Sequence, residues 1–357
     1  MKKRSISQKM QKRTVKTKRV QESVTIGMDL GDRTSRYCIL GSEGEILREG
    51  QVQTSKAGMM ETFGSLGRAR IAIEVGTIVA NPRQVKLITE SSRKDDRLDA
   101  QTLARLARID PQLLRPIQHR SEVAQTALTV IRVRAALIAV RTSLVNTARG
   151  LAKAMGERLP KCDADQMGVL RAESLPPKLR QLLEPLLKEV ESLTEKIKDS
   201  DREIEQIARK DYPETALLQQ VGGVGPLIAL TFVLTIDNKN RFQKSRDVGC
   251  YIGLRPKRSD SGQRQPQLRI TKEGDPYLRT MLVQGAHYIL SRRGPDTDLK
   301  RWGLRLAERG GKRAKKKAVV AVARKLSILL HRLWVTGEVY EPLRNQNLRD
   351  LCKKSAA

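Results

Sequence analysis

The sequence predicts an α/β domain followed by a mainly helical, all-α region. Short apolar segments of strand-like composition lie between residues 24 and 75, and two long heptad patterns follow between residues 124 and 207. After residue 211, glycines and prolines separate shorter helical segments. A chain of 357 residues is long enough for two or three domains. The expected divisions are a basic disordered arm at 1–23, the α/β domain at 24–118, a coiled-coil region at 119–210, a C-terminal domain at 211–340 and a tail at 341–357.

The chain is strongly basic. It has 69 lysines and arginines against 39 acidic residues, a formal net charge of +30, so nucleic acid is the first partner to expect. Residues 1–20 contain no acidic residue and fit either an arm that contacts phosphates or a solvated tail. Aromatic residues make up only 3% of the chain, which favours backbone electrostatics over base stacking. A second basic cluster follows Gly310 and Gly311 and consists of Lys312, Arg313, Lys315, Lys316 and Lys317.

Cysteine and histidine usage argues against a zinc site. The four cysteines have no CxxC spacing, and the three histidines have no ligand spacing. Scattered thiols suit a reducing compartment. No apolar segment follows the basic N-terminus, and no stretch reaches transmembrane length without charge. We therefore expect a soluble cytoplasmic protein.

The α/β domain is expected to place two carboxylates at the ends of strands. Asp29 ends the first strand, and Glu74 lies on the last one. A hairpin, joined by the turn-like sequence GSEGE, and a helix lie between them. This order is the opening of an RNase H-like fold, which collects carboxylates from separate elements around two metal ions. The expected elements are strands at 24–30, 36–40, 46–52 and 70–75 and a weak helix at 56–66.

Asp96 and Asp99 lie three residues apart in the segment SSRKDDRLDAQTLARLAR, so they share one face of a helix. One interpretation is a divalent metal site, because metal ions are the usual means of cutting or joining phosphodiesters. The other is a helix N-terminus, where acidic side chains favour the helix dipole and flanking Arg93, Lys94 and Arg97 balance their charge. The two upstream carboxylates add weight to the metal interpretation. Clustered carboxylates resist full ionisation without a cation, which implies Mg²⁺ as a cofactor.

The middle region carries two patterns with apolar residues at alternating steps of four and three, as in a coiled coil. The two helices could pair within one chain or across a dimer, and the pattern fits both. The connection at 156–177 contains three prolines. The patterned positions are Ala124, Leu128, Ile131, Ala135, Ile138, Thr142 and Val145, then Leu183, Leu186, Val190, Leu193, Ile197, Ser200, Ile204 and Ile207.

The sequence LLQQVGGVGPLIAL at 217–230 has a glycine-rich turn between two helical segments. One interpretation is a helix-hairpin-helix, in which Gly222, Gly223 and Gly225 let backbone N–H groups approach a phosphate. The other is a plain pair of packed helices joined by a turn. The two interpretations carry equal weight.

A basic loop with a serine precedes the last conspicuous helix. Asp275 and Pro276 supply an N-cap and a first helical residue for a helix that runs toward Leu290. In the loop, Ser261 stands before Gly262, where it could be a nucleophile against a phosphate, although most such pairs are only turns. The basic side chains expected to contact nucleic acid there are Lys257, Arg258, Arg264 and Lys272.

Taken together, these blocks resemble the DEDD-type transposases of bacterial insertion sequences, the family that includes the Piv-like invertases and the RNA-guided bridge recombinases. The resemblance runs in family order from about residue 24 to residue 334. The blocks SSRKDDRLDAQTLARLARID and YIGLRPKRSDSGQ with RITKEGDPYLRTMLVQGAHYIL are the most specific. The other matching stretches are IGMDLGDRTSRYCIL, IAIEVGT, VANPRQVKLI, GERLPKC and QQVGGVGPLIAL.

The resemblance implies a RuvC-like domain whose acidic tetrad, Asp29, Glu74, Asp96 and Asp99, binds Mg²⁺. It also implies that Ser261 attacks DNA and forms a covalent phosphoserine link. The composite site would be assembled from two subunits of a dimer, or a dimer of dimers, through the coiled coil. A noncoding RNA would pair with donor and target DNA, so that base pairing reads the sequence. Such a protein is expected to be nucleoid-associated.

One stretch departs from the family pattern. In the family, a helix follows the strand that bears the glutamate, whereas here Thr77 runs directly into Ile78. A crossover between parallel strands needs about a dozen residues or more, so we interpret the junction as an internal deletion. The alternative function is therefore a catalytically inactive remnant that only binds nucleic acid. The sequence GMDLGDRTS also resembles the first phosphate loop of actin- and hexokinase-type kinases, but the charge of +30 and the lack of a later nucleotide-binding glycine signature argue against that class.

Overall fold

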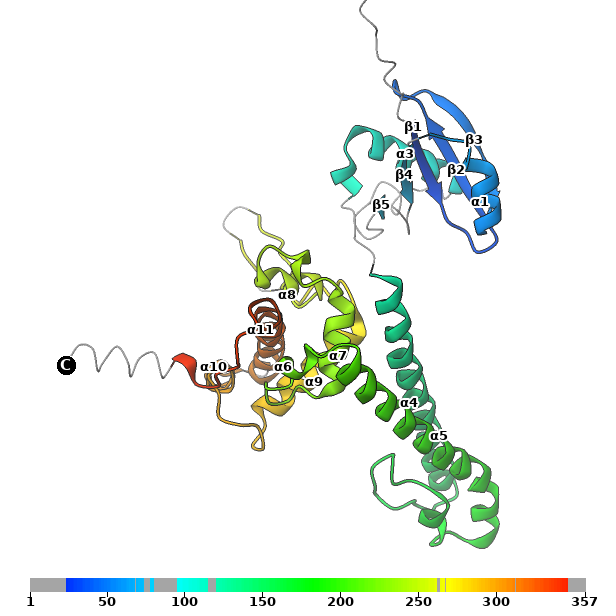
Figure 1. Cartoon of the computed structure of the whole chain (residues 1–357). Coiled ribbons are helices and arrows are strands. Elements are labelled where there is room, and N and C mark those ends of the chain that lie inside the picture. Colours follow the sequence, from blue (N-terminus) through cyan, green and yellow to red (C-terminus); the bar gives the residue numbers. More distant parts are fainter. Residues whose placement is uncertain are drawn as a thin grey trace, which may run out of the picture. The chain divides into compact units, whose positions relative to one another are not determined.

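The computed structural model describes residues 24–67, 69–73, 78–79, 95–114, 120–261, 264–266, 268–311 and 313–345. The chain divides into two compact units, Met1–His119 and Arg120–Ala357. We call them the sheet unit and the helical unit. Figure 1 labels their elements.

The sheet unit contains a five-stranded sheet with the order β3-β2-β1-β4-β5. The first three strands are antiparallel neighbours, whereas β4 lies parallel to β1 and β5 lies parallel to β4. The strands predicted from the sequence are confirmed to within about two residues at most ends. The bounds are β1 Val24–Asp29, β2 Thr34–Leu40, β3 Ile46–Gln53, β4 Ala69–Ile73 and β5 Ile78–Val79.

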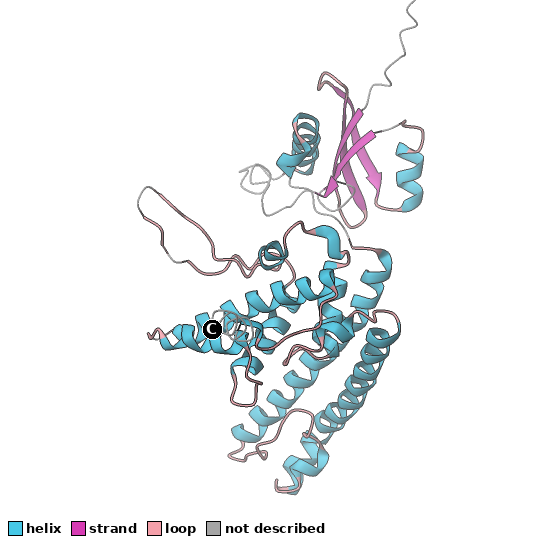
Figure 2. Ribbon diagram, turned by 60° about the vertical axis from the view of Figure 1, so that its left-hand side comes forward, coloured by secondary structure: helices cyan, strands magenta, loops and turns pink. Residues whose placement is uncertain are grey.

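Helices cover both faces of this sheet, α1 (Lys56–Phe63) on one and α3 (Asp96–Ile109) on the other. Figure 2 shows them on opposite sides of the strands. Ile26 and Met28 of β1 share a core with side chains of α1. Cys38 and Leu40 of β2 pack instead with two alanines of α3. This division follows from the alternation of side chains along a strand.

The connection between β4 and β5 is only four residues long, 74–77. The two strands pair in parallel, with Ala72 opposite Ile78 and Ile73 opposite Val79. Four residues make about one helical turn, so no crossover helix of ordinary length fits between them. Glu74 itself lies outside the described residues.

The helical unit begins with a long antiparallel hairpin of α4 (Glu122–Ala154) and α5 (Pro177–Lys210). At one end Val145, Ala148 and Ala152 of α4 share a core with the first turns of α5. At the other end Leu128 and Ile131 pack with the last turns of α5. Of the two pairings that the heptad patterns allow, the structure therefore shows the one within a single chain.

By length and composition alone, α4 could cross a membrane, since its most apolar window has a mean hydropathy of 1.6. Core helices of water-soluble proteins pass the same test. Because α4 contributes residues to two of the cores described above, its apolar character is explained in part by packing within the unit.

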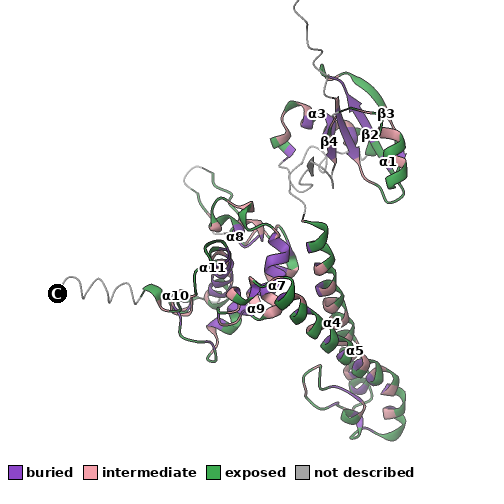
Figure 3. Cartoon of the chain, viewed as in Figure 1, coloured by how far each residue is buried: buried purple, intermediate pink, exposed green. Residues whose placement is uncertain are grey.

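The core of the unit contains α7 (Pro226–Ile236), which lies against α4, α5, α6 and α9 and in which every residue from 229 to 236 is buried. Figure 3 shows α7 buried among its neighbours. Phe232, Leu282 and Leu326 are among the fully buried side chains of the shared core. The other helices are α6 Thr215–Leu218, α8 Val248–Tyr251, α9 Pro276–Leu290, α10 Asp298–Glu308 and α11 Ala314–Thr336. Short 3₁₀ turns lie at Pro111–Leu114 in the sheet unit and at Val169–Ala172, Lys239–Arg241 and Ser245–Asp247 in the helical unit.

Candidate catalytic sites

The first candidate site lies where α3 crosses β1. The two elements approach so closely at Gly27 that a Cβ atom there would lie 2.1 Å from the carbonyl oxygen of Ala100 and 2.4 Å from the amide nitrogen of Ala104. Only glycine fits at this crossing. Because strand side chains alternate, Asp29 points to the same face as Gly27, two residues further along.

The direction of α3 brings its N-terminus to the Asp29 end of β1. Arg108, in the last turn of α3, donates a hydrogen bond of 3.0 Å to the carbonyl of Ser42. Ser42 belongs to the turn after Leu40, which pairs with Thr25 near the start of β1. The helix therefore runs antiparallel to β1, and its first turn lies toward the end of that strand, where Asp29 stands.

Asp96 and Asp99 continue the face of α3 that packs on the sheet. The buried residues of the helix are Ala100, Leu103, Ala104 and Ala107, and positions 96 and 99 stand one turn before 100 and 103. Asp99 is half-buried and Asp96 is exposed. The prediction that the pair shares one helix face is confirmed.

The cap of α3 is neither of these two residues. Asp95 is the N-cap, and its carboxylate accepts a hydrogen bond of 2.9 Å from the amide of Arg97. The pair is therefore not needed to cap the helix, although acidic side chains in a first turn still favour the helix dipole.

Arg97 was expected to balance the charge of Asp96 and Asp99, but its ion pair is with Glu49. Its guanidinium donates to Glu49 of β3 at 2.8 Å through Nε, with Nη2 at 2.7 Å. Gln101 of α3 donates to the same carboxylate. Burial alone would raise the pKa of Glu49, but the hydrogen bonds from Gln101 and Arg97 lower it below its usual value. Arg97 thus ties α3 to the sheet through Glu49.

The carboxylates supply oxygen donors of the kind that Mg²⁺ prefers. Asp29 and the first turn of α3 lie at the same end of one face of the sheet. Within the part of the chain that the structure describes, however, no group of three His, Cys, Asp or Glu side chains is arranged to hold a metal ion. Glu74, the fourth expected ligand, is outside that part.

The second candidate site is the exposed hairpin that carries Ser261. Its two strands, between residues 253 and 272, are joined by backbone hydrogen bonds, among them Thr271 N–H to Arg255 O and Lys257 N–H to Arg269 O, each at 2.8 Å. The last described rung joins Ser261 and Arg264, with N···O distances of 3.2 and 3.0 Å. Ser261 is exposed. Figure 1 shows the described part of the hairpin near α8. We call this element the serine hairpin.

Basic side chains line the serine hairpin. Lys257, Arg258, Arg264 and Lys272 are all exposed, and their contact with nucleic acid stays a prediction. Among the described residues, none hydrogen-bonds to the Ser261 hydroxyl.

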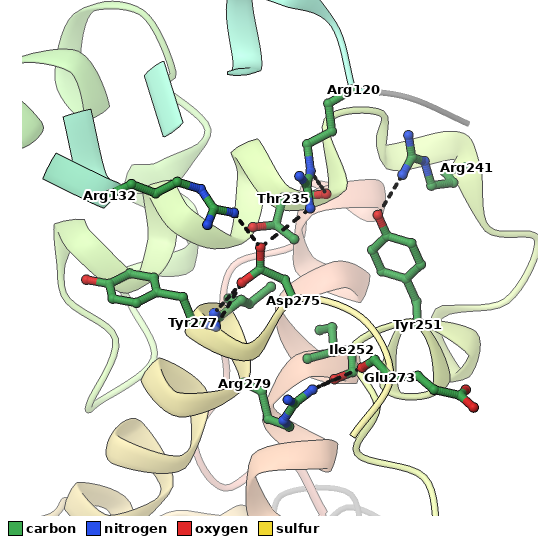
Figure 4. Close-up of polar contacts among 11 residues, drawn as sticks. Arg120, Arg132, Thr235, Arg241, Tyr251, Ile252, Glu273, Asp275, Tyr277 and Arg279 are labelled. Atoms are coloured by element: carbon green, nitrogen blue, oxygen red, sulfur yellow. Dashed lines mark hydrogen bonds and ion pairs between the residues drawn. The ribbon is translucent and has the colours of Figure 1, made fainter. Parts of the chain in front are cut away.

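The base of the serine hairpin is held rigidly. Gly253 has φ +77°, and a Cβ atom there would lie 2.0 Å from the carbonyl oxygen of Glu273. Arg279 of α9 donates from Nη1 to the carbonyls of Ile252 at 2.9 Å and Glu273 at 3.0 Å, as Figure 4 shows. The arm therefore projects from a fixed root.

Asp275 joins this root to the start of α4. Its Oδ1 accepts hydrogen bonds from the amides of Tyr277 at 2.9 Å and Leu278 at 3.0 Å, which confirms the predicted N-cap. Its Oδ2 lies 3.0 Å from Arg132 Nη2 and 3.6 Å from Arg120 Nη2. Figure 4 shows both arginines reaching this one carboxylate. The two ion pairs were not predicted, because nothing local in the sequence relates Asp275 to residues more than 140 positions away.

Two of the three glycines in the glycine-rich turn, Gly222 and Gly223, lie in close contact with other segments. Gly223 has φ +90°, and a Cβ atom there would meet the carbonyl oxygen of Gly285 and the ring of Tyr288, each at 3.0 Å. Gly222 lies against Pro295. Gly225 is exposed, with nothing within 4 Å of a Cβ atom. Because α6 has only four residues, the described geometry supports a turn packed on α9, and a phosphate contact stays a prediction.

Comparison with known proteins identifies the class of the chain. Residues 73–155 match a DEDD transposase domain, and residues 215–301 match the transposase domain of the IS116/IS110/IS902 family. The chain is 28% identical over 341 residues to the transposase for insertion sequence element IS1111A of Coxiella burnetii, which covers 88% of this chain and 90% of the relative. It is also 28% identical over 257 residues to the probable family 20 transposase of Pseudomonas aeruginosa, with coverage of 70% and 74%.

The chain is thus a transposase of the insertion-sequence class. It carries the transposase domains of the IS110/IS116/IS902 family, as the sequence motifs indicate. The DEDD domain implies an RNase H-like fold, in agreement with the small sheet covered by helices. Asp96 and Asp99 lie inside the first matched range and Ser261 inside the second, whereas Asp29 lies outside both.

Proposed function

We propose that this transposase cuts and rejoins the DNA of an insertion sequence with two sets of groups. Asp29, Glu74, Asp96 and Asp99 hold Mg²⁺, and Ser261 is the nucleophile. The observation that carries the proposal is the placement of Asp29 and the first turn of α3 at one end of one face of the sheet. A second observation supports it, the exposure of Ser261 near the tip of a basic arm.

In the proposed chemistry, Ser261 Oγ attacks a backbone phosphorus. An Oγ–P ester forms, the P–O bond to the neighbouring sugar breaks, and the hydroxyl proton passes to a base while the departing sugar oxygen gains one. Arg258 and Arg264 stabilise the charge that develops on the phosphate oxygens. A hydroxyl of the partner strand then reverses the reaction on the same phosphorus and releases the serine.

In this proposal the carboxylate set has a role separate from that of Ser261. Bound Mg²⁺ would polarise phosphate oxygens and activate an attacking oxygen. We propose that carboxylates of one subunit act with the serine hairpin of another, in a dimer or a dimer of dimers. The partners are donor and target DNA together with a noncoding guide RNA. The low aromatic content of 3% and the net charge of +30 support a protein that grips backbones while base pairing reads the sequence.

The test is to mix the full chain with its flanking noncoding RNA, Mg²⁺ and labelled donor and target DNA, and to run a denaturing gel. We expect a covalent protein–DNA adduct that disappears in Ser261→Ala. Ser259→Ala is the matched control, because Ser259 is exposed on the same arm and should leave the adduct unchanged. Loss in both variants, or in neither, would overturn the role of Ser261.

A second candidate function is supported by the short connection between β4 and β5, in which no crossover helix fits. It is a protein that binds RNA and DNA without cutting them. RNA and DNA binding by the wild-type chain with no adduct under any metal condition would favour this function over the first.

A further inference from the structure

A groove of about 1070 Å³ lies beyond the catalytic elements of the helical unit. It is bounded by α10, α11 and the segment 338–345 that follows α11. The second matched transposase domain ends at residue 301, so most of this groove lies outside the region with an assigned family. Neither Ser261 nor Asp275 lines it.

Its lining is rich in cations. Arg301, Arg305 and Arg309 follow one another at steps of four along α10 and its C-terminal cap, so they form one ridge, and the first two line the groove. Lys325 and Arg332 of α11 line the opposite side. Like charges at this spacing destabilise a helix by a few tenths of a kcal/mol per pair, a cost that a bound anion would offset.

Acidic side chains neutralise only part of this lining. Glu338 pairs with Arg332 at 3.2 Å and with Arg344 at 3.1 Å, and Asp296 pairs with Arg301 at 2.6 Å. In the described residues, neither Arg305 nor Lys325 pairs with a carboxylate. Burial, and next the charge of Arg305, lower the pKa of Lys325. Within the part of the chain that the structure describes, Arg305 and Lys325 therefore have no acidic ion-pair partner, while Asp298 and Glu341 also line the groove.

The position of the Trp302 ring indicates whether a base or a phosphate of a nucleic acid fits this groove. The ammonium of Lys325 lies 3.8 Å from the centroid of this ring and covers one face. A base cannot stack on the face that Lys325 covers, and Trp302 also packs against the apolar core of the unit, so the ring holds the cation rather than offering a stacking platform. The ligand that suits the remaining chemistry is an oxyanion.

We propose that this groove binds a backbone phosphate of nucleic acid through Arg305 and Lys325. The strand would continue past Arg309 toward exposed basic residues at the start of α11, namely Arg313, Lys315, Lys316 and Lys317. The site is a second grip on the nucleic acid, separate from the serine hairpin. It does not depend on the chemistry proposed for Ser261.

The test measures the salt dependence of binding by the full chain, using fluorescence anisotropy with duplex DNA, single-stranded DNA and an RNA hairpin as separate probes. The variant is Arg305→Gln with Lys325→Gln. Losing two phosphate contacts should reduce the slope of log K against log salt by about 1.8 for duplex DNA, or about 1.4 for a single strand. Between 0.05 and 0.2 M salt, the wild type should then lose about tenfold more affinity for duplex DNA than the variant. The probe that shows the change identifies the source of the phosphate.

The matched control is Lys178→Gln with Lys196→Gln, two exposed lysines on α5 that remove the same total charge. An equal change of slope in variant and control for every probe would overturn the proposal, as would no change in either. Arg305→Lys, which keeps the charge, should restore most of the slope. Because Arg305 is exposed, Arg305→Gln alone should fold and lower the slope by about 1.

Discussion

The carboxylates of the sheet unit and Ser261 of the helical unit are held by different kinds of contact. Asp29 and Asp99 lie next to the crossing of β1 and α3, where a Cβ atom on Gly27 would meet backbone atoms of α3. Ser261 projects on two strands that are joined by backbone hydrogen bonds and are exposed along most of their length. One set of groups is fixed by packing, and the other is fixed only at its root.

This difference fits the role that we propose for each set. Carboxylates that share a cation repel one another, so their spacing has to be imposed by a rigid support. A nucleophile that must reach a phosphate inside a nucleic acid gains from an exposed arm with cations beside it. We therefore expect substitutions in the sheet unit to act through packing and metal affinity, and those on the serine hairpin to act through chemistry with little effect on stability.

The largest effect should come from removing one carboxylate charge. Asp99→Asn is expected to slow adduct formation by about 100-fold or more and to weaken the Mg²⁺ dependence of the reaction. Asp95→Asn is the matched control in the same helix, because asparagine caps a helix as well as aspartate does. The measurement is the rate of adduct formation across a Mg²⁺ titration. Equal losses in both variants would mean that the acidic turn serves only the helix.

The next prediction tests whether packing between β1 and α3 holds the carboxylates in place. Gly27→Ala should lower the free energy of unfolding of the sheet unit by about 3 kcal/mol or more, because the new methyl group meets backbone atoms of α3 that cannot move independently. Gly150→Ala in α4 should have the opposite sign and stabilise by about 0.5–1 kcal/mol, since nothing lies within 4 Å of its Cβ atom.

Circular dichroism and tryptophan fluorescence together separate the two units. Both tryptophans, Trp302 and Trp334, belong to the helical unit, so their fluorescence reports only its unfolding. In Gly27→Ala, the loss should appear by circular dichroism and leave the fluorescence transition in place. A shift of the fluorescence transition alone would contradict the packing argument.

Local signals explain how much of the fold the sequence predicts. Alternating and β-branched segments predict strands β1 to β4, and Asp275 before Pro276 predicts the start of α9. The step of three between Asp96 and Asp99 predicts their shared face, because the helix period fixes it. Each of these rests on residues that are neighbours in the chain.

Contacts between distant segments explain what the sequence does not predict. Arg97 pairs with Glu49, 48 residues away, and Asp275 pairs with Arg132. The sequence predicts a basic loop in place of the serine hairpin, because the two strands are polar on both sides and show no apolar alternation. The need for glycine at position 27 depends on the path of α3, which the local sequence does not contain.

The root of the serine hairpin should respond to substitution more than its tip. Asp275→Ala removes the N-cap of α9 and leaves two arginines without their partner, so it should lower the free energy of unfolding by about 2–3 kcal/mol. Asp275→Asn keeps the cap and loses only the charge, so about half of that effect is expected. Ser261→Ala and Ser259→Ala should change stability by less than about 0.5 kcal/mol.

Urea unfolding followed by tryptophan fluorescence measures all four variants. The comparison between root and tip would fail if the two serine variants were as unstable as Asp275→Ala. It would be sharpened if Asp275→Asn also slowed adduct formation at unchanged nucleic-acid affinity, because that result would tie the orientation of the arm to its root.

The smallest effect is a pH dependence confined to the helical unit. His331 is buried, with Nε2 at 2.9 Å from the carbonyl of Lys239 and Nδ1 at 3.0 Å from Ser245 Oγ. The carbonyl can only accept, so the proton is on Nε2 and the serine hydroxyl donates to Nδ1. Burial lowers the pKa of His331 below its usual value, and the hydrogen bond to Lys239 offsets this in part.

The direction of the change in the free energy of unfolding follows from which state takes up the proton. Below about pH 6.5 the unfolded chain protonates this histidine and the folded chain does not, so the free energy of unfolding should fall by up to about 1.4 kcal/mol per pH unit until the folded pKa is reached. Urea unfolding by tryptophan fluorescence between pH 7.5 and 5.5 measures it. His331→Gln should flatten this dependence, and His287→Gln, at an exposed position, should leave it unchanged. An unchanged slope in His331→Gln would show that the titrating group lies elsewhere in the helical unit.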